Sequence, residues 1–463
     1  MNTRNHTPLW LAGLLLGFAT APLRAQGYGL PVAVNYNVAL TNGAPVTFRP
    51  LVNDSDPNNF ALTITGVSRP SLGNATWTGT CITYTPNVSF SAFAGSDTFT
   101  YTISDGYGMA TAQVSVGNPF YLKKGNYAGT LNNPGGGFLT LATTASGAFT
   151  GKLRLSRATY NLNGTFASNG TYTTTVGGIP LNLQFDVGEL TRSAYGQYNI
   201  TGTYNGIAFT TYHALYNSTS NPAPQVGKYT VLLPAATGTD PSIPSGTGYT
   251  TLTVTEGGSV TIAGTLADGT IFTDGVYITG GSNALSNSFP IYAALGYGVA
   301  GAVTGSMTFE DNPGVSDCDG TMTWLKPAQT NSTFYKNGFT TSLAAIGSRY
   351  TQPPYRTLAL NLANTSPNAS ILLSEPDFPI PIYHQLSITH GSNALTDTVQ
   401  VTDNGADALT LSISASAGTF TGSFIHPVTG KSVNIKGALL YKQSRAAGFF
   451  LSPTQSGNVT IWP

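Results

Sequence analysis

Charged residues are scarce in this chain of 463 amino acids. Only 8% of its residues are Asp, Glu, Lys or Arg, and 19 basic side chains balance 19 acidic ones. An average soluble domain has about 25% charged residues. Without an excess or a cluster of positive charge, the chain cannot neutralise a phosphate backbone or bind an anionic membrane surface electrostatically. The composition therefore argues against a nucleic-acid partner.

Cysteine is almost absent, because the chain has only Cys81 and Cys318. Two cysteines of an exported protein could pair. They fall in different predicted modules, however, and independent cores rarely place two positions within bridging distance. We expect two separate, unpaired residues. A domain takes roughly 100–200 residues, so the chain should hold about three or four, each large enough to bury a core without disulfide bridges.

Long apolar runs are missing after the N-terminus, and no transmembrane helix is expected in the mature chain. The N-terminus combines Arg4, an apolar stretch at residues 9–18 (LWLAGLLLGF) and the small residue Ala25. This order is typical of a secretory signal peptide at residues 1–25, cut before Gln26. Cleavage after Ala21 and an uncleaved anchor are the alternatives. The mature chain should be secreted, periplasmic or bound to the cell surface.

Glycine and uncharged polar residues take the place of the missing charges. The chain contains 54 Gly, 28 Pro and 24 Tyr, together with many Thr, Ser and Asn residues. Thr, Tyr, Phe and Val favour a pleated, half-buried surface, and Gly, Asn and Pro favour tight turns. The composition predicts an all-β protein with many short connections.

The first predicted module, residues 27–117, shows clean period-two alternation. Phe99, Tyr101 and Ile103 share one strand face, and threonines occupy the other face. About seven such short strands, separated by turn signals, occur in roughly 90 residues, which is typical of an immunoglobulin-like sandwich. We expect the three apolar side chains to be buried together.

Three motifs of this module carry a family resemblance. Residues 51–57 (LVNDSDP), 82–87 (ITYTPN) and 97–106 (DTFTYTISDG) resemble the bacterial cadherin-like, Ig-like repeats of secreted proteins and adhesins. The resemblance covers about a fifth of the chain. It implies a β-sandwich with a spacer or adhesive role.

The same resemblance raises the question of structural calcium. Members of the family often carry further acids after the Asp-Pro pair, whereas this chain continues with Asn58-Asn-Phe60. Calcium prefers several charged oxygens, so any site built from Asp54, Asp56 and Asp105 is weakened. We favour the alternative that these aspartates cap turns, and we predict no cofactor.

The remainder of the chain contains a repeated pattern, Gly-x-apolar-x-Gly-x-apolar. It occurs at residues 147–153 (GAFTGKL), 301–307 (GAVTGSM) and 418–424 (GTFTGSF). Each copy predicts the second strand of a hairpin, with Phe149, Val303 and Phe420 in equivalent buried positions. Period two places both glycines of a copy on the same strand face as its buried apolar residue. Glycine is unfavourable in strands, and its repetition indicates bulges, bends or close backbone approach. We therefore predict antiparallel β-meanders that form open barrels or sandwiches.

Proline-rich breaks suggest where these meanders begin and end. The pairs Pro222 with Pro224 and Pro353 with Pro354 interrupt the alternating segments. The predicted modules are a β-meander at residues 120–221, a second at 225–352 and a C-terminal β module at 354–463.

The sequence offers no catalytic, cofactor-binding or metal-binding residues that we would assign. Outside the signal peptide its histidines are His213, His384, His390 and His426, none spaced as a metal-ligand pair. We interpret them as turn or surface residues. No Gly-x-Ser-x-Gly elbow and no phosphate loop occurs. The acidic group at residues 310–319 could supply a glycosidase pair, but a solvated turn is the simpler interpretation.

These observations favour a non-catalytic, exported structural or adhesion protein that binds an unknown cell-surface protein or polysaccharide. The alternative is a carbohydrate-binding protein that stacks sugars on exposed tyrosines, for which Tyr127, Tyr195, Tyr198 and Tyr204 provide material. Buried positions at barrel rims are the simpler interpretation of those tyrosines. An outer-membrane β-barrel and a secreted hydrolase are weaker alternatives.

Overall fold

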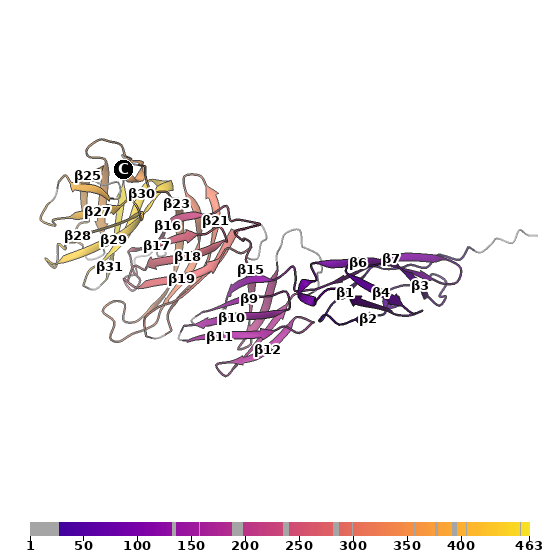
Figure 1. Ribbon diagram of the computed structural model, residues 1–463. Coiled ribbons are helices and arrows are strands. Elements are labelled where there is room, and N and C mark those ends of the chain that lie inside the picture. The colour runs from indigo at the N-terminus through magenta and orange to yellow at the C-terminus, as the bar shows by residue number, and fades with distance from the viewer. Residues whose placement is uncertain are drawn as a thin grey trace, which may run out of the picture.

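The computed structural model describes residues 27–131, 136–156, 158–187, 198–234, 240–280, 287–298, 300–354, 357–375, 378–390, 396–403, 405–453 and 455–463. Within these ranges the elements are strands and short 3-10 turns, so the chain is all-β, as predicted. No helix among them is long and apolar enough to cross a membrane. The predicted signal peptide lies outside the described residues. Figure 1 shows the β units in a row, from the indigo N-terminal unit to the yellow C-terminal unit.

The N-terminal unit is a sandwich of two sheets, ordered β1-β7-β6-β3 and β2-β5-β4. Its strands are β1 (Tyr36–Ala39), β2 (Val46–Phe48), β3 (Thr63–Val67), β4 (Gly73–Trp77), β5 (Ile82–Pro86), β6 (Ser96–Ser104) and β7 (Met109–Gly117). Two 3-10 turns, η1 (Pro50–Val52) and η2 (Phe90–Ala92), lie between them. Strand β1 pairs with β7 in parallel, and the other pairs of this unit are antiparallel. The seven strands confirm the predicted Ig-like sandwich.

The core of this sandwich follows the sequence alternation. Phe99, Tyr101 and Ile103 on β6 are all buried, as predicted. The ring of Phe99 stacks on Tyr84 from the opposite sheet, with centroids 6.0 Å apart. The Tyr84 hydroxyl donates to the buried carboxylate of Asp97 at 2.8 Å, which satisfies both polar groups inside the core.

The second unit is an eight-stranded antiparallel sheet, ordered β11-β10-β9-β8-β15-β14-β13-β12. Its strands are β8 (Gly125–Thr130), β9 (Gly137–Thr143), β10 (Ala148–Leu155), β11 (Ala158–Thr165), β12 (Thr171–Val176), β13 (Ile179–Phe185), β14 (Asn199–Tyr204) and β15 (Ile207–His213). Consecutive strands pair as antiparallel hairpins, except β11 and β12, and the last strand, β15, pairs with the first, β8. The sheet therefore curls into a barrel-like meander whose ends are β11 and β12.

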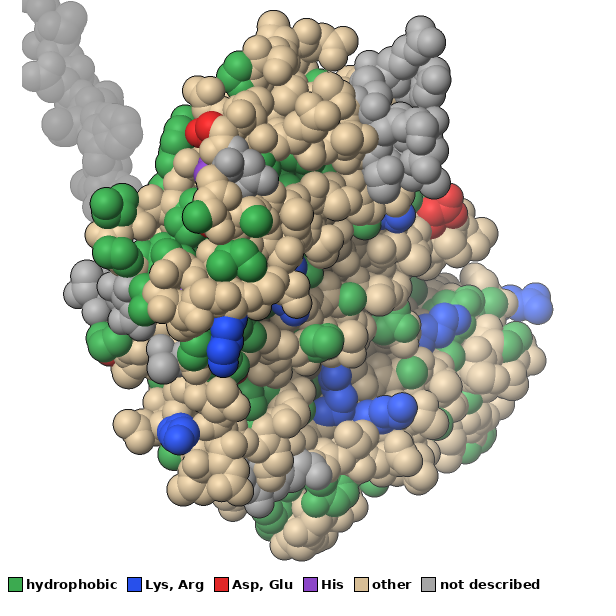
Figure 2. Space-filling model, turned by 90° about the vertical axis from the view of Figure 1, so that its left-hand side faces the viewer, with side chains coloured by type: hydrophobic (Ala, Val, Ile, Leu, Met, Phe, Trp, Pro, Cys, Tyr) green, Lys and Arg blue, Asp and Glu red, His purple; other side chains and the backbone are tan. Residues whose placement is uncertain are grey.

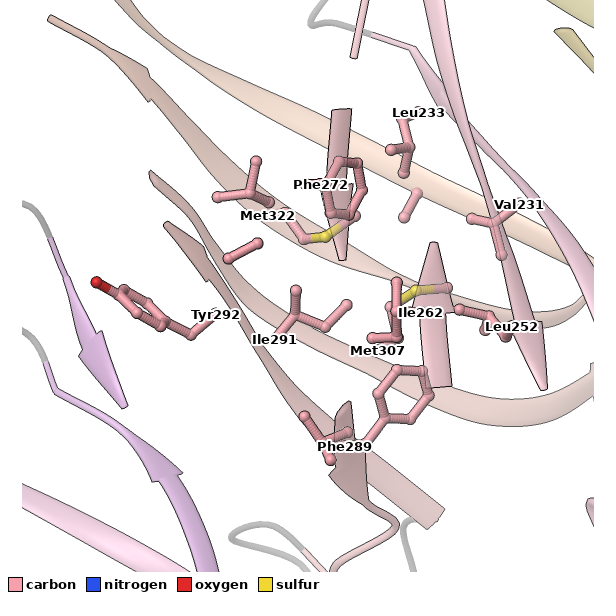
Figure 3. Close-up of a cluster of buried hydrophobic side chains, with 14 of the residues drawn as sticks. Val231, Leu233, Leu252, Ile262, Phe272, Phe289, Ile291, Tyr292, Met307 and Met322 are labelled. Atoms are coloured by element: carbon pink, nitrogen blue, oxygen red, sulfur yellow. The ribbon is translucent and has the colours of Figure 1, made fainter. Parts of the chain in front are cut away.

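The third unit repeats this topology in the order β19-β18-β17-β16-β23-β22-β21-β20. Its strands are β16 (Gly227–Pro234), β17 (Thr247–Val254), β18 (Ser259–Thr265), β19 (Ile271–Tyr277), β20 (Asn287–Ala294), β21 (Ala302–Asn312), β22 (Ser316–Lys326) and β23 (Phe339–Tyr350). Inward side chains fill the interior, where Ile262, Phe289, Met307 and Met322 pack together (Figure 3).

The fourth unit is a closed eight-stranded barrel, not an open one. Its strands are β24 (Ala369–Ser374), β25 (Ile382–His390), β26 (Thr396–Val401), β27 (Thr410–Ser414), β28 (Thr419–Ile425), β29 (Ser432–Leu440), β30 (Arg445–Leu451) and β31 (Ser456–Trp462), with 3-10 turns η3 (Ala359–Asn361) and η4 (Tyr441–Gln443). Pairing of β24 with β31 closes it. Its interior is filled by aliphatic and aromatic side chains, including Phe420, Phe424 and Phe450.

The repeated glycine pattern coincides with close contact between strands. Phe149, Val303 and Phe420 are all buried, as predicted. Each lies on the second strand of a hairpin, β9–β10, β20–β21 or β27–β28. A Cβ atom added at the second glycine of each copy would overlap a carbonyl oxygen of the adjacent strand. These glycines are Gly151, Gly305 and Gly422. Glycine permits the close approach that a strongly coiled sheet requires.

Two details of the repeat prediction are wrong. The first glycine of each copy precedes its strand; Gly147 and Gly418 occupy turns with φ of 79° and 69°. They therefore do not share a strand face with the apolar residues. The copies also occupy different places in their sheets, because β10, β21 and β28 are the third, sixth and fifth strands. The larger repeat is the eight-strand meander, which the local motif does not reveal.

Polar and aromatic contacts join the second and third units. Arg154 on β10 makes a 2.7 Å ion pair with the buried Asp274 on β19, and its guanidinium lies over the ring of Phe138. Phe138 stacks on Tyr292, which points away from its own core toward the preceding sheet (Figure 3). Burial raises the pKa of Asp274, and the ion pair with Arg154 opposes that shift.

The closed barrel packs against β16 and β17 of the third unit. Small and aliphatic side chains fill this contact: Leu232, Ala438, Leu440 and Ala447. The Thr230 hydroxyl donates to the Leu439 carbonyl at its centre. At the other junction, Asn118 follows β7 and donates to the carbonyls of Phe90 and Ala145, each at 2.8 Å. Side-chain contacts therefore hold each unit against the next.

Candidate functional site

The distal end of the N-terminal sandwich is the part of that unit farthest from the rest of the chain. Strand β7 ends at Gly117 beside the second unit, so the β6–β7 turn lies at the opposite end (Figure 1). We define the distal end as residues 28–34, 53–60, 77–82 and 104–109. A backbone hydrogen bond from Ile64 to the Gly79 carbonyl places the β4–β5 turn at this same end.

Three aromatic rings meet at the distal end. The centroid of Tyr107 is 4.6 Å from that of Tyr28 and 4.9 Å from that of Phe60. Tyr28 and Phe60 are 5.4 Å apart, edge to face. We call these three residues the distal aromatic cluster. The rings are tilted against one another, so they form a compact group and not a flat row.

The distal aromatic cluster lies among other exposed apolar side chains. Tyr107 is 65% exposed and Tyr28 is 50% exposed. At the same end of the domain, Leu30, Trp77 and Met109 are 64%, 46% and 65% exposed. Single exposed apolar residues are normal, but a concentration of large ones typically marks an interaction surface. Aromatic residues and Met are also enriched in protein interfaces.

Two aspartates fix the loops that carry the cluster. Asp56 Oδ1 accepts hydrogen bonds from the backbone N–H groups of Asn58 and Phe60, at 2.8 and 2.9 Å. Asp105 Oδ1 accepts from Tyr107 and Gly108, at 2.8 and 2.6 Å. The donors of Gly108 and Tyr107 lower the pKa of Asp105. The predicted turn-capping role of these aspartates is confirmed, and it sets the backbone position of Phe60 and Tyr107.

Asp54 joins the N-terminal segment to the core. Its Oδ1 accepts from the Val34 N–H at 2.8 Å and from the Tyr101 hydroxyl at 2.8 Å. The Tyr101 hydroxyl is also 2.8 Å from the Val34 carbonyl. Burial, followed by the hydrogen bond to Asp54, raises the pKa of Tyr101. Residues 28–34 are thus held against the sandwich beside the aromatic cluster.

The second carboxylate oxygens of the three aspartates are the atoms that bear on the question of structural calcium. The Oδ2 atoms of Asp54, Asp56 and Asp105 are buried and have no hydrogen-bond partner. Such oxygens suit a hard cation such as calcium. Nevertheless, no group of three or more His, Cys, Asp or Glu side chains in the described residues could hold a metal ion. We assign no metal to these oxygens.

The acidic group of the third unit binds a lysine of the closed barrel. Lys442 forms ion pairs with Asp311 and Asp317, the latter at 2.7 Å. Asp317 Oδ2 also accepts from the Arg349 backbone N–H at 2.7 Å. The group lies at the β21–β22 turn and the Asp311 side chain is 82% exposed, as a solvated turn predicts, but both carboxylates also contact the closed barrel through Lys442. A hollow of about 270 Å³ lies beside Glu310, Asp311 and Arg349.

Two histidines are buried and bound to carboxylates, which corrects their interpretation as turn or surface residues. The nitrogens of His384 lie 3.1 Å from Asp403 Oδ1 and 2.6 Å from Asp407 Oδ2. His426 Nε2 lies 2.8 Å from Glu375 Oε1. Its Nδ1 accepts from two backbone N–H groups, so the proton belongs on Nε2. Neither ring has a nitrogen left for a substrate or a metal.

Sequence reasoning missed these pairs because their members are far apart in the chain. The partners of His384 are 19 and 23 residues away, and Glu375 is 51 residues from His426. They meet only because the closed barrel brings the same ends of its strands together. Of the remaining histidines, His213 contacts the Lys124 carbonyl at 3.1 Å, and the His390 side chain lies outside the described part.

Three of the four tyrosines proposed as sugar platforms are not exposed. Tyr127, Tyr198 and Tyr204 are buried, which supports their simpler interpretation as core and rim residues. Tyr195 lies outside the described residues. Both cysteines are free, as expected; Cys318 is fully buried, and burial raises the pKa of its thiol.

Comparison with known proteins gives one specific match. No curated protein matches the chain. Among solved structures, a double mutant of the vaccine antigen transferrin binding protein B from Haemophilus parasuis is 12% identical over 88% of this chain and 85% of that chain, with a TM-score of 0.21. A protein of unknown function from Nostoc punctiforme is 10% identical over 50% of this chain and 98% of that chain, with a TM-score of 0.14. Such TM-scores do not indicate a shared fold. Residues 29–117 match the family described as a bacterial Ig domain, which confirms the resemblance for the N-terminal unit.

Proposed function

We propose that this is a non-catalytic, exported adhesion protein in which the three eight-stranded units present the bacterial Ig domain to a partner. The observation that carries the proposal is the distal aromatic cluster, Tyr28, Phe60 and Tyr107, at the end of the Ig domain that contacts no other unit. A cell-surface protein or polysaccharide is the class of partner.

The composition of the distal loops supports recognition of a macromolecule. Besides the apolar residues of 28–34, they contain Tyr, Gly, Ser, Asn and Asp, with Trp77 and Met109 at their borders. Tyr and Trp provide large contact areas at low entropic cost, while Gly, Ser and Asn supply adaptable hydrogen bonds. Asp56 and Asp105 hold the two central loops by backbone hydrogen bonds. Preorganised loops lose less entropy on binding.

The contacts between units support a display role. The buried ion pair of Arg154 with Asp274 and the contact at Asn118 restrict motion between neighbouring units. A stiff row of units keeps the distal end away from the closed barrel. The surface at the barrel end of the molecule is mainly uncharged, and most of the charged side chains visible there are Lys or Arg (Figure 2). A low-charge surface suits a spacer that makes few electrostatic contacts.

The test is a bead-adhesion assay with the full chain. Beads coated with wild-type protein, or with a Tyr28→Ala and Tyr107→Ala double variant, are scored for attachment to bacterial cells. The matched control is Ile271→Ala, since Ile271 is a comparably exposed apolar residue on β19. We expect the double variant to lose attachment and the control to retain it. Protease or periodate treatment of the cells separates a protein partner from a polysaccharide. Equal attachment of wild type and double variant would contradict the proposal.

A further inference from the structure

A second surface feature lies on the second unit, away from the Ig domain. The outer face of β12 to β15 is hollowed, with a volume of about 720 Å³. Ligand sites typically measure about 300–1,000 Å³. The outer face of a curled sheet is usually convex, so a hollow of this size is a distinctive feature of this unit.

Cross-strand rows of uncharged polar side chains line this hollow. Register places Thr171 beside Gln184 and Gln184 beside Thr201, and it places Thr173 beside Asn182 and Asn182 beside Thr203. Neighbours in such a row are about 4.5–5.5 Å apart between Cβ atoms. Successive residues on one face of a strand are about 6.6 Å apart. The rows therefore form a regular grid of hydroxyl and amide groups.

Much of the hydrogen-bonding capacity of this grid is unused. In the part of the chain that the structure describes, the hydroxyls of Thr173, Thr201 and Thr210 make no hydrogen bond to another protein group. Asn182 donates to the Thr203 hydroxyl at 3.1 Å, and within the described residues its side-chain oxygen accepts no hydrogen bond. A threonine hydroxyl can both donate and accept. The free hydroxyl groups can therefore either donate a hydrogen bond to a ligand hydroxyl or accept one from it.

The lining carries no charge at all. Its residues are Thr, Asn, Gln, Gly, Ala, Leu, Phe and Tyr. Phosphate and carboxylate ligands are typically bound through Arg, Lys or helix N-termini, and none of these is present. Charged ligands would lose hydration without compensation. The hollow therefore suits a neutral ligand that is rich in hydroxyl groups.

An aromatic ring and apolar groups complete the surface. Tyr212 on β15 borders the hollow and is half-buried, whereas Leu183 and Phe209, which also line it, have side chains buried in the core of the unit. Ala208, beside Thr203, keeps the floor open because its side chain is small. Sugar rings combine polar edges with apolar C–H faces, and these faces pack on aromatic rings. Polar rows with an aromatic border match that combination.

We infer that the outer hollow of β12–β15 binds a neutral polysaccharide. The hydroxyl and amide rows would pair with sugar hydroxyls, and Tyr212 would stack on one ring. This site is separate from the distal end of the Ig domain, so either proposal can fail without the other. The tyrosine that we assign to sugar stacking is Tyr212. Three of the tyrosines considered for this role from the sequence, Tyr127, Tyr198 and Tyr204, are buried.

The test is affinity electrophoresis of the full chain in gels that contain dextran, galactomannan or xylan as neutral probes. Alginate and heparin are the anionic probes. We expect retardation by at least one neutral probe and by neither anionic probe. A Thr201→Val and Thr210→Val double variant keeps the shape of the hollow but removes two hydroxyls, and binding should weaken about tenfold. Tyr212→Ala should weaken it further.

The matched control is Thr175→Val on the same strand face of β12, because Thr175 is exposed but does not line the hollow. The control should bind as wild type does. Lack of retardation by every neutral probe, or equal retardation of the double variant and the wild type, would overturn the inference. Loss of polysaccharide binding in the Tyr28→Ala and Tyr107→Ala variant, with the hollow variants unaffected, would assign the binding to the Ig domain instead.

Discussion

Gly422 offers the sharpest test of why glycine recurs in these sheets. The residue lies on β28 between Leu411 of β27 and Ile435 of β29. A Cβ atom there would overlap the carbonyl oxygen of Thr410 and lie 3.1 Å from the Ile435 side chain. The carbonyl belongs to the strand ladder, so it cannot move without disturbing the pairing of β27 with β28.

The expected cost follows from these two contacts. Overpacking costs about 1–3 kcal/mol, and weakening one ladder hydrogen bond costs about 0.5–1.5 kcal/mol. Gly422→Ala should therefore destabilise the closed barrel by about 2–4 kcal/mol, and Gly422→Val by more. For a unit of this size, about 2 kcal/mol lowers the melting temperature by at least about 8 °C.

Differential scanning calorimetry of the full chain measures the shift, and hydrogen exchange of peptides from residues 410–440 assigns it to the closed barrel. Gly275→Ala is the control, because nothing lies within 4 Å of a Cβ at that strand position. It should be neutral or stabilising by up to about 1 kcal/mol. If Gly422→Ala melts and exchanges as the wild type does, the glycine is not a close-contact residue. The repeated motif would then reflect only composition.

Four further predictions address the other units. Tyr101→Ala should destabilise residues 27–117 by about 3–5 kcal/mol in urea unfolding, since the ring is fully buried; a loss below about 1 kcal/mol would contradict its placement. The lowered pKa of Asp105 means that its contribution is complete above its ordinary value of 3.8 and is lost as pH falls below it; Asp105→Asn should flatten that part of the pH–stability curve, and an unchanged curve would refute the role. Arg154→Met leaves Asp274 buried and unpaired, which should cost about 3–5 kcal/mol and loosen the two units in small-angle scattering, with partial rescue by Asp274→Asn; the absence of rescue would argue against the ion pair. N-terminal sequencing of the exported protein should begin at Gln26, and a chain that retains residues 9–18 would disprove cleavage there.

Much of the Ig domain could be predicted from sequence because its signals are local. Alternation placed Phe99, Tyr101 and Ile103 on one face, and turn chemistry identified Asp56 and Asp105 as caps. The functional use of these loops was not predictable in the same way. Tyr28 and Phe60 are 32 residues apart, and only the sandwich topology places both rings beside Tyr107.

The outer hollow shows a similar limit. Threonines at alternate positions of a strand can be recognised in the sequence as an exposed face, and Thr171 and Thr173 of β12 follow this pattern. Whether such a face is convex or hollowed depends on the coiling of four strands together, which no local pattern encodes. The free hydroxyls of Thr201 and Thr210 become a possible site only on that shape.

The sequence by itself determined the all-β class, the faces of individual strands and the places where glycine allows close approach. These properties depend on neighbouring residues and on period two. Only the tertiary structure decided which neighbouring unit or strand packs against the apolar face of each strand. Phe449 and Phe450 are adjacent and equally apolar, yet Phe449 packs into the core of the third unit and Phe450 into the closed barrel. The pairing of β24 with β31 likewise joins strands at the two ends of one unit. The twist and shear of all eight strands set that closure, and through it the contacts of His384 with Asp407 and of His426 with Glu375.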